Sequence, residues 1–205
     1  MGRSKQRNDE CLAVARATSD VRGECDALTG LARVALRDGR FHDVVALARQ
    51  ARERAKAAGD AAAEASPLHL EAAGVRMLRD YAAARELYLE SLALSENEGN
   101  ARRVAMEQHN LGWVELHLDN IDEAATRFQL LDLSAGADAY ADAWKDVNWA
   151  AVHAARGDEA EARRRLERGE RALEKLGVVL DPDDQFELDW VRSRLSAGRG
   201  PERQS

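Results

Sequence analysis

The sequence predicts an all-α fold built from repeated helix hairpins, and three observations support this. Alanine, leucine, glutamate and arginine dominate a chain of 205 residues that has only three prolines and 5% aromatic residues, a composition that favours helices. Four stretches share one pattern, in which an apolar-periodic helix ends at a short polar turn and a second helix begins at once. Corresponding positions in these stretches recur at intervals of 40, 40 and 38 residues, and such a fixed period is typical of helical-repeat proteins.

The four predicted hairpins follow one another along the chain. Their expected bounds are about residues 23–58, 60–97, 99–134 and 138–176. A lone helix over residues 5–17 precedes them, with Cys11, Leu12 and Ala15 on the face expected to cover the first hairpin.

A closing helix is predicted over residues 182–197. Asp181 is its expected N-cap and Pro182 its first helical residue, as is common where helices begin. All these elements form one predicted domain over residues 1–197, and the tail, 198–205, is predicted to be disordered.

Small and bulky residues alternate between the two helices of each hairpin. The small residues on the first helices are Ala32, Ala72, Gly112 and Ala150. The residues expected opposite them on the second helices are Ala48, Tyr88, Phe128 and Leu166. This pairing is what closely packed helices require.

The residues at corresponding positions of the four hairpins resemble the pattern of the tetratricopeptide repeat family. The third hairpin matches most clearly, with Leu111, Gly112, Ala124 and Phe128 at the family's leucine, glycine, alanine and aromatic positions. The period is longer than the ~34 residues of the standard unit, and such long-period repeats resemble those of bacterial regulator and signalling proteins and of motor light chains. The resemblance implies a right-handed superhelical array whose first helices line a concave groove.

Projecting the family's groove onto this chain gives a set of candidate binding residues. The groove residues implied in this way are Arg33, Arg37, His69, Arg76, His109, Asn110, Trp113, His117 and Asn148. No acid is among them, although the chain has a net charge of −7. Because arginine and amide side chains bind carboxylates and peptide backbone, we expect the partner to be a protein or peptide segment that carries acidic groups.

Two plainer interpretations of these residues stay open. The arginines can be ordinary solvated side chains, since isolated surface charges are common. Trp113 can be part of the core between hairpins instead of a ligand contact.

The histidines and two glutamates raise the question of a metal or acid–base site. His109 and His117 lie about 12 Å apart along a helix, which is too far for one metal ion, so no metal or cofactor is expected. Glu71 stands where the other hairpins have Leu31, Leu111 and Trp149. Either a register shift turns Leu70 inward, or Glu71 joins Glu115 and nearby histidines in a polar cluster.

Charge and sequence signals limit the classes of function. The acidic net charge argues against a general nucleic-acid binder, and the arginine-rich run over residues 161–175 is interleaved with glutamates as on a solvated helix face. No secretory signal or membrane-spanning segment is found, and Cys11 and Cys25 are expected to be reduced and buried. A cytoplasmic protein is expected.

The chain contains no phosphate-binding loop, dinucleotide fingerprint, zinc-protease or serine-hydrolase motif. We therefore expect a protein- or peptide-binding scaffold and not an enzyme. Two alternatives remain: self-association through apolar surface near Cys11 and Leu12, and a small-molecule-binding or catalytic groove that uses Glu71, Glu115 and nearby histidines.

Overall fold

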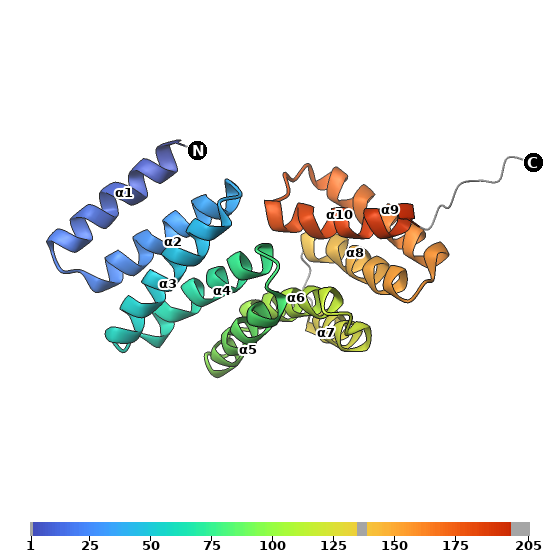
Figure 1. Cartoon of the computed structure of the whole chain (residues 1–205), viewed down its shortest axis with the longest axis horizontal. Coiled ribbons are helices and arrows are strands. Elements are labelled where there is room, and N and C mark those ends of the chain that lie inside the picture. Colours follow the sequence, from blue (N-terminus) through green and yellow to red (C-terminus); the bar gives the residue numbers. More distant parts are fainter. Residues whose placement is uncertain (1, 135–138, 198–205) are drawn as a thin grey trace, which may run out of the picture. The chain divides into compact units, whose positions relative to one another are not determined.

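The computed structural model describes residues 2–134 and 139–197, and every regular element in this part of the chain is an α-helix (Figure 1). The ten helices are α1 (Gly2–Ala17), α2 (Val21–Arg37), α3 (Phe41–Ala57), α4 (Ala61–Met77), α5 (Tyr81–Asn97), α6 (Ala101–His117), α7 (Ile121–Ser134), α8 (Ala139–Ala155), α9 (Glu159–Leu176) and α10 (Pro182–Ala197). The predicted all-helical fold of adjacent helix pairs is confirmed. The predicted tail, residues 198–205, lies outside the described residues.

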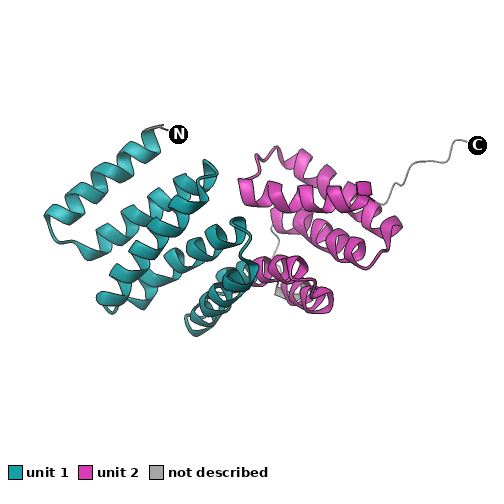
Figure 2. Cartoon of the chain, viewed as in Figure 1, with its two compact units in different colours: residues 1–107 teal, residues 108–205 magenta. Residues whose placement is uncertain are grey.

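The chain divides into two compact units, residues 1–107 and 108–205 (Figure 2). The first holds α1 to α5 and the beginning of α6, and the second holds the rest of α6 and α7 to α10. The division therefore falls inside a continuous helix. The sequence pattern gives no sign of it, because α6 has the same length as α2 to α5 and is flanked by the same three-residue turns.

A repeat of 20 residues underlies the 40-residue period. Each of α2 to α6 is 17 residues long, and three residues connect each helix to the next. The middle residue of each turn has a positive φ; these residues are Ser19, Gly39, Gly59, Arg79, Gly99 and Asp119. The period exceeds the standard one because both helices of the first two hairpins are 17 residues long.

The turns that end in aspartate also cap the helix that follows, whereas Arg40, which precedes α3, makes no such side-chain hydrogen bond. The backbone N–H of the third turn residue donates back across the turn, as from Asp60 to the carbonyl of Ala55 at 3.1 Å. The Asp60 side chain then accepts from the N–H of Ala63 at 3.0 Å, which stabilises the first turn of α4. This hydrogen bond and the Arg22 guanidinium hold the pKa of Asp60 below its usual value.

One of the predicted pairs of a small and a bulky residue, Gly112 and Phe128, is found in the packing. A Cβ atom placed on Gly112 of α6 would lie 2.3 Å from Cε1 of Phe128 on α7, so the ring occupies the space that the glycine leaves. A Cβ on Gly74 of α4 would similarly lie 2.8 Å from Cγ2 of Val45 on α3. Glycine thus permits closer helix packing at both places.

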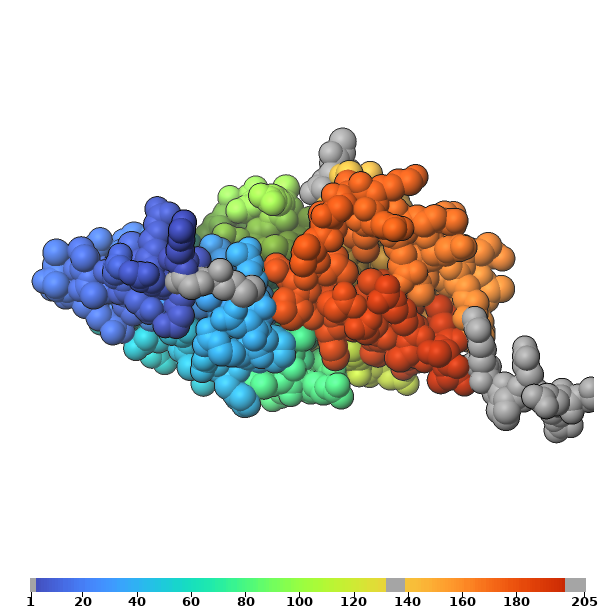
Figure 3. Space-filling view, turned by 90° about the horizontal axis from the view of Figure 1, so that it is seen from above, coloured from blue at the N-terminus to red at the C-terminus, as the bar shows by residue number. Residues whose placement is uncertain are grey.

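The two units have different cores. In the second unit Trp113, Phe128 and Trp144 form an aromatic centre, with side chains of α8, α9 and α10 packed around it. Figure 3 shows the outer surface of α9 and α10 in orange to red. In the first unit the buried residues are mostly alanine, leucine and valine.

No helix in the described part of the chain is long and apolar enough to cross a membrane.

The first helix, α1, covers α2 as expected, but one of its predicted contacts is wrong. Ala15 is buried and Leu12 is half-buried, whereas Cys11 is exposed. Within its unit α1 packs mainly on α2, so only a narrow stripe of its surface is covered. Cys25 is buried as predicted, and burial raises the pKa of its thiol.

Candidate functional site

The nine predicted groove residues all lie on first helices of hairpins, but they differ in exposure. Arg33 and Arg37 are exposed on α2 in the first unit. On α4 in the same unit, His69 is half-buried and Arg76 is buried. The five remaining residues, on α6 and α8 in the second unit, are buried or half-buried.

Trp113 belongs to the core, which is the second of the two interpretations made from the sequence. Its side chain is fully buried, and its ring meets the rings of Phe128 and Trp144 edge to face. The expectation that it offers open contact area to a ligand is therefore not met. Gly112 leaves room for the Phe128 ring, which in turn contacts the ring of Trp113.

A buried chain of hydrogen bonds links α6 to α8 around Trp113. The Trp113 Nε1–H donates to Oδ1 of Asn148 at 2.9 Å, and the Asn148 amide nitrogen lies 3.2 Å from Nδ1 of His109. Asn148 is 1% exposed, so its amide satisfies polar groups that burial would otherwise leave unpaired. Both Asn148 and Trp113 thus hold the second unit together.

His117 is held by the last helix. Its Nε2 lies 2.8 Å from Oε2 of Glu187 on α10, and both side chains are at least 96% buried. The ring of Phe186 lies 5.5 Å from the imidazole, centroid to centroid, and that of Trp190 lies 5.6 Å away. His117, one histidine of the predicted groove, is therefore surrounded by acidic and aromatic side chains of α10.

Tyr140 on α8 adds a further contact with α10. Its hydroxyl donates to a carboxylate oxygen of Asp184. Burial is the main cause of a strongly raised pKa of Tyr140, and the charge of Asp184 adds to it. The tyrosine therefore stays protonated and able to donate over the ordinary range of pH.

His69 pairs with a residue that the sequence analysis did not select. Its Nδ1 lies 3.0 Å from Oε1 of Glu107, and the Ser91 hydroxyl donates to the same oxygen at 2.7 Å. Glu107 is fully buried. Because Ser91 donates to the carboxylate and not to the imidazole, the order of contacts differs from that of a serine nucleophile activated by histidine.

Glu71 is the centre of an ion-pair cluster, which answers the question its position raised. Its carboxylate accepts from Arg49 at 3.0 Å and from Arg52 at 3.3 Å. Arg52 also binds Glu64 at 3.0 Å and contacts Glu90, so one guanidinium joins α3, α4 and α5. Leu70 and Glu71 are both buried, and the charge is tolerated because it is paired.

Glu115 is fully buried and accepts a hydrogen bond from the side-chain amide of Asn120 at 2.8 Å. Glu71 belongs to the first unit and Glu115 to the second. The carboxylates that pair with His69 and His117 are those of Glu107 and Glu187. The histidine–carboxylate pairs of this protein thus use residues other than the two expected glutamates.

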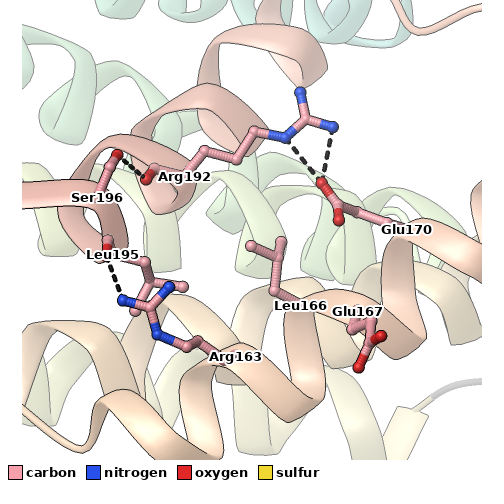
Figure 4. Close-up of a pocket in the computed structure, with 7 residues that line it drawn as sticks. All are labelled: Arg163, Leu166, Glu167, Glu170, Arg192, Leu195 and Ser196. Carbon is pink, nitrogen blue, oxygen red and sulfur yellow. Dashed lines mark hydrogen bonds and ion pairs between the residues drawn. The ribbon is translucent and has the colours of Figure 1, made fainter. Parts of the chain in front are cut away.

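A pocket of about 560 Å³ lies between α9 and α10 (Figure 4). Leu166 and Leu195 contribute its apolar surface. The Arg192 guanidinium binds Glu170 at 2.7 Å, and that of Arg163 donates to the carbonyl of Leu195. Its arginines are therefore engaged by neighbouring groups of the same unit.

Metal-binding residues are not gathered anywhere in the described part of the chain. Over residues 2–134 and 139–197, no three histidine, cysteine, aspartate or glutamate side chains form a group that would hold a metal ion.

Comparison with known proteins identifies a similar fold. No family model matches the sequence, and no curated protein matches it. A crystal structure of BtubC (BKLC) from P. vanneervenii is similar, with a TM-score of 0.66 and 20% sequence identity over 96% of this chain and 82% of that one. At this identity the similarity concerns the helical fold alone.

Proposed function

We propose that this protein is an interaction module of the tetratricopeptide type, whose first helices bind a peptide or protein segment that carries acidic groups. Helix-hairpin arrays usually present the surface of one set of helices to a partner. The observation that carries the proposal is the exposed pair Arg33 and Arg37 on α2, one helical turn apart on a protein of net charge −7. Two guanidinium groups so close together suit a carboxylate-bearing segment.

The second unit supports the same preference from within the chain. There an acidic helix, α10, packs against His117 through Glu187. Histidine occupies predicted groove positions in both units, whereas the groove arginines all lie in the first unit. The free thiols of Cys11 and Cys25 agree with the cytoplasmic location that we propose.

The proposal is tested with two immobilised peptide pools of equal length, one rich in aspartate and glutamate and one rich in lysine and arginine. We expect the full chain to retain the acidic pool only, and the double variant Arg33→Glu, Arg37→Glu to lose at least tenfold of that binding. The matched control is Arg171→Glu, an exposed arginine on the second helix α9, which should bind as the unchanged chain does. Retention of the basic pool, or equal binding by the double variant, contradicts the proposal.

Self-association is a second candidate, and one observation favours it. Val14 on α1 is 63% exposed near the exposed Cys11, and a second copy would cover this apolar surface. Light scattering in a reducing buffer decides the matter. A mass that rises with concentration in the unchanged chain but not in Val14→Lys supports it, and a constant monomer mass removes it.

A further inference from the structure

The first helix, α1, occupies the repeat position of a second helix of a hairpin. Its residues lie 40 positions before their equivalents on α3, and a three-residue turn follows both helices. Ser4 and Cys11 are exposed on α1. Their equivalents on α3, Val44 and Ala51, are fully buried. The face that a second helix turns toward the first helix of its hairpin is therefore open on α1.

Val14 lies on the same open face. Its equivalent on α3 is Arg54, whose guanidinium donates to Glu24 on α2 at 2.7 Å. This position thus faces the first helix of a hairpin. On α1 the valine is instead 63% exposed, so an apolar side chain is available to a helix that would lie there.

The last helix, α10, occupies the repeat position of a first helix. The carbonyl of Asp181 accepts the first helical hydrogen bond of α10, as that of Asp20 does for α2, which aligns the two helices. Twelve residues later each helix carries a small residue, Ala32 on α2 and Ser193 on α10. Ala32 is fully buried and Ser193 is exposed. The face on which a first helix receives its second helix is therefore open on α10.

The pocket of Figure 4 adjoins this open face of α10. Ser196, one turn after Ser193, and Glu170 of α9 both contribute to its lining. The equivalent of Glu170 on α3 is Arg52, which contacts Glu90 of α5, the next second helix. The pocket is thus the place where a further second helix would lie against α9 and α10.

The two open faces belong to helices of opposite charge. Four basic and two acidic residues lie on α1, whereas four acidic and two basic residues lie on α10. We propose that α10 of one copy and α1 of a second copy pair as a complete hairpin, so that copies join head to tail. This inference rests on self-association, the second candidate function, and names its two surfaces. Because the surfaces differ, the interface is heterologous and joins more than two copies.

One like-charge contact weakens this pairing. Glu10 of α1 is the equivalent of Glu90, so in the assembled hairpin it lies near Glu170 of α9. In the first unit the same contact is an ion pair, because α3 has Arg52 there. Facing carboxylates oppose association. Glu10→Lys should therefore lower the concentration needed for assembly at least fivefold, whereas Glu53→Lys, the same charge change at an exposed residue of α3, should not.

The decisive test uses full chains with one face blocked, and light scattering in a reducing buffer. Val14→Lys blocks α1 and Ser193→Arg blocks α10. Each variant alone should stay a monomer at concentrations where the unchanged chain exceeds the mass of a dimer. An equimolar mixture should form a dimer, because one open α10 meets one open α1. The matched control is Gln50→Arg, at an exposed residue of α3, which should assemble as the unchanged chain does.

Circular dichroism establishes folding of each variant, and Cys11→Lys replaces Val14→Lys if that chain does not fold. A mixture that stays monomeric overturns the inference, as does a Glu10→Lys chain that assembles no better than Glu53→Lys.

Failure of the inference is separable from failure of the proposed functions. Assembly of Ser193→Arg alone, together with its loss in Val14→Lys, retains self-association through α1 and rejects the role of α10. A constant monomer mass, in Glu10→Lys as well, rejects both. Binding of acidic segments is measured independently with the peptide pools.

Discussion

The ring of Phe128 fills the space beside Gly112: a Cβ atom on this glycine would lie 2.3 Å from Cε1 of the ring. A methyl group there must displace a fully buried aromatic side chain. We expect Gly112→Ala to lower the free energy of unfolding by about 1–3 kcal/mol, as overpacked cores usually do. Urea unfolding measures the change.

The same pair offers an internal control. Phe128→Leu alone should also destabilise, because it leaves a cavity. The double variant should lose less than the two single losses together, since the smaller side chain makes room for the methyl group. Losses that add fully would show that the two residues do not compete for the same space.

Substitutions at two turn residues with positive φ should change the stability of the fold in opposite directions. Gly99 has a φ of +64° with no atom within 4 Å of an added Cβ, so Gly99→Ala should cost about 1–2 kcal/mol through backbone conformation alone. Asp119 has a φ of 62° at the equivalent place, and Asp119→Gly should stabilise slightly or be neutral. Thermal unfolding of both variants checks this, and a stabilising Gly99→Ala would contradict the turn geometry.

The lowered pKa of Glu24 leads us to expect that the first unit loses stability in acid. Hydrogen bonds from Arg16 and then Arg54 hold its pKa below the ordinary value of 4.5. Its contribution to stability is therefore present above about pH 4.5 and is lost as the pH falls through the lowered value. Glu24→Gln should reduce stability at pH 7 and make the unfolding free energy less dependent on pH in this acidic range.

The control for this measurement is Glu53→Gln on α3, an exposed residue, which should leave the pH dependence unchanged. Urea unfolding at several values between neutral pH and pH 3 provides the comparison. An unchanged slope in Glu24→Gln would show that this carboxylate does not contribute to the acid response.

Arg52 and Arg49 both bind Glu71, but Arg52 should contribute more to the free energy of unfolding. The Arg52 side chain is 13% exposed and that of Arg49 is 57% exposed. Replacing Arg52 by alanine leaves buried Glu71 with one exposed partner, so we expect a loss of about 2–4 kcal/mol. Arg49→Ala should cost less than about 1 kcal/mol, and equal losses would contradict the central role of Arg52.

The helices and their packing were largely predictable from the sequence because both follow from local periodicity. Polar turn residues and the spacing of apolar residues located the helix pairs. The small residue Gly112 and the bulky residue Phe128, at matching repeat positions, indicated a contact between neighbouring helices. Trp113 was harder to interpret, since its burial depends on Asn148, 35 residues away.

The polar pairs were not predictable in the same way. Glu107 and Glu187 meet His69 and His117 across 38 and 70 residues, and neither glutamate was selected by the repeat alignment. The one available signal was position, since Glu187 lies between the two aromatic residues of the last helix. Glu71 likewise owes its paired state to arginines of the preceding helix.

Hydrogen–deuterium exchange of the full chain, with and without a peptide selected from the acidic pool, tests most directly whether the first helices bind acidic segments. We predict slower exchange in α2 or another first helix, and loss of this protection in the variant Arg33→Glu, Arg37→Glu if the peptide lies on α2. Protection confined to the second helices α3, α5, α7 and α9 would contradict the account.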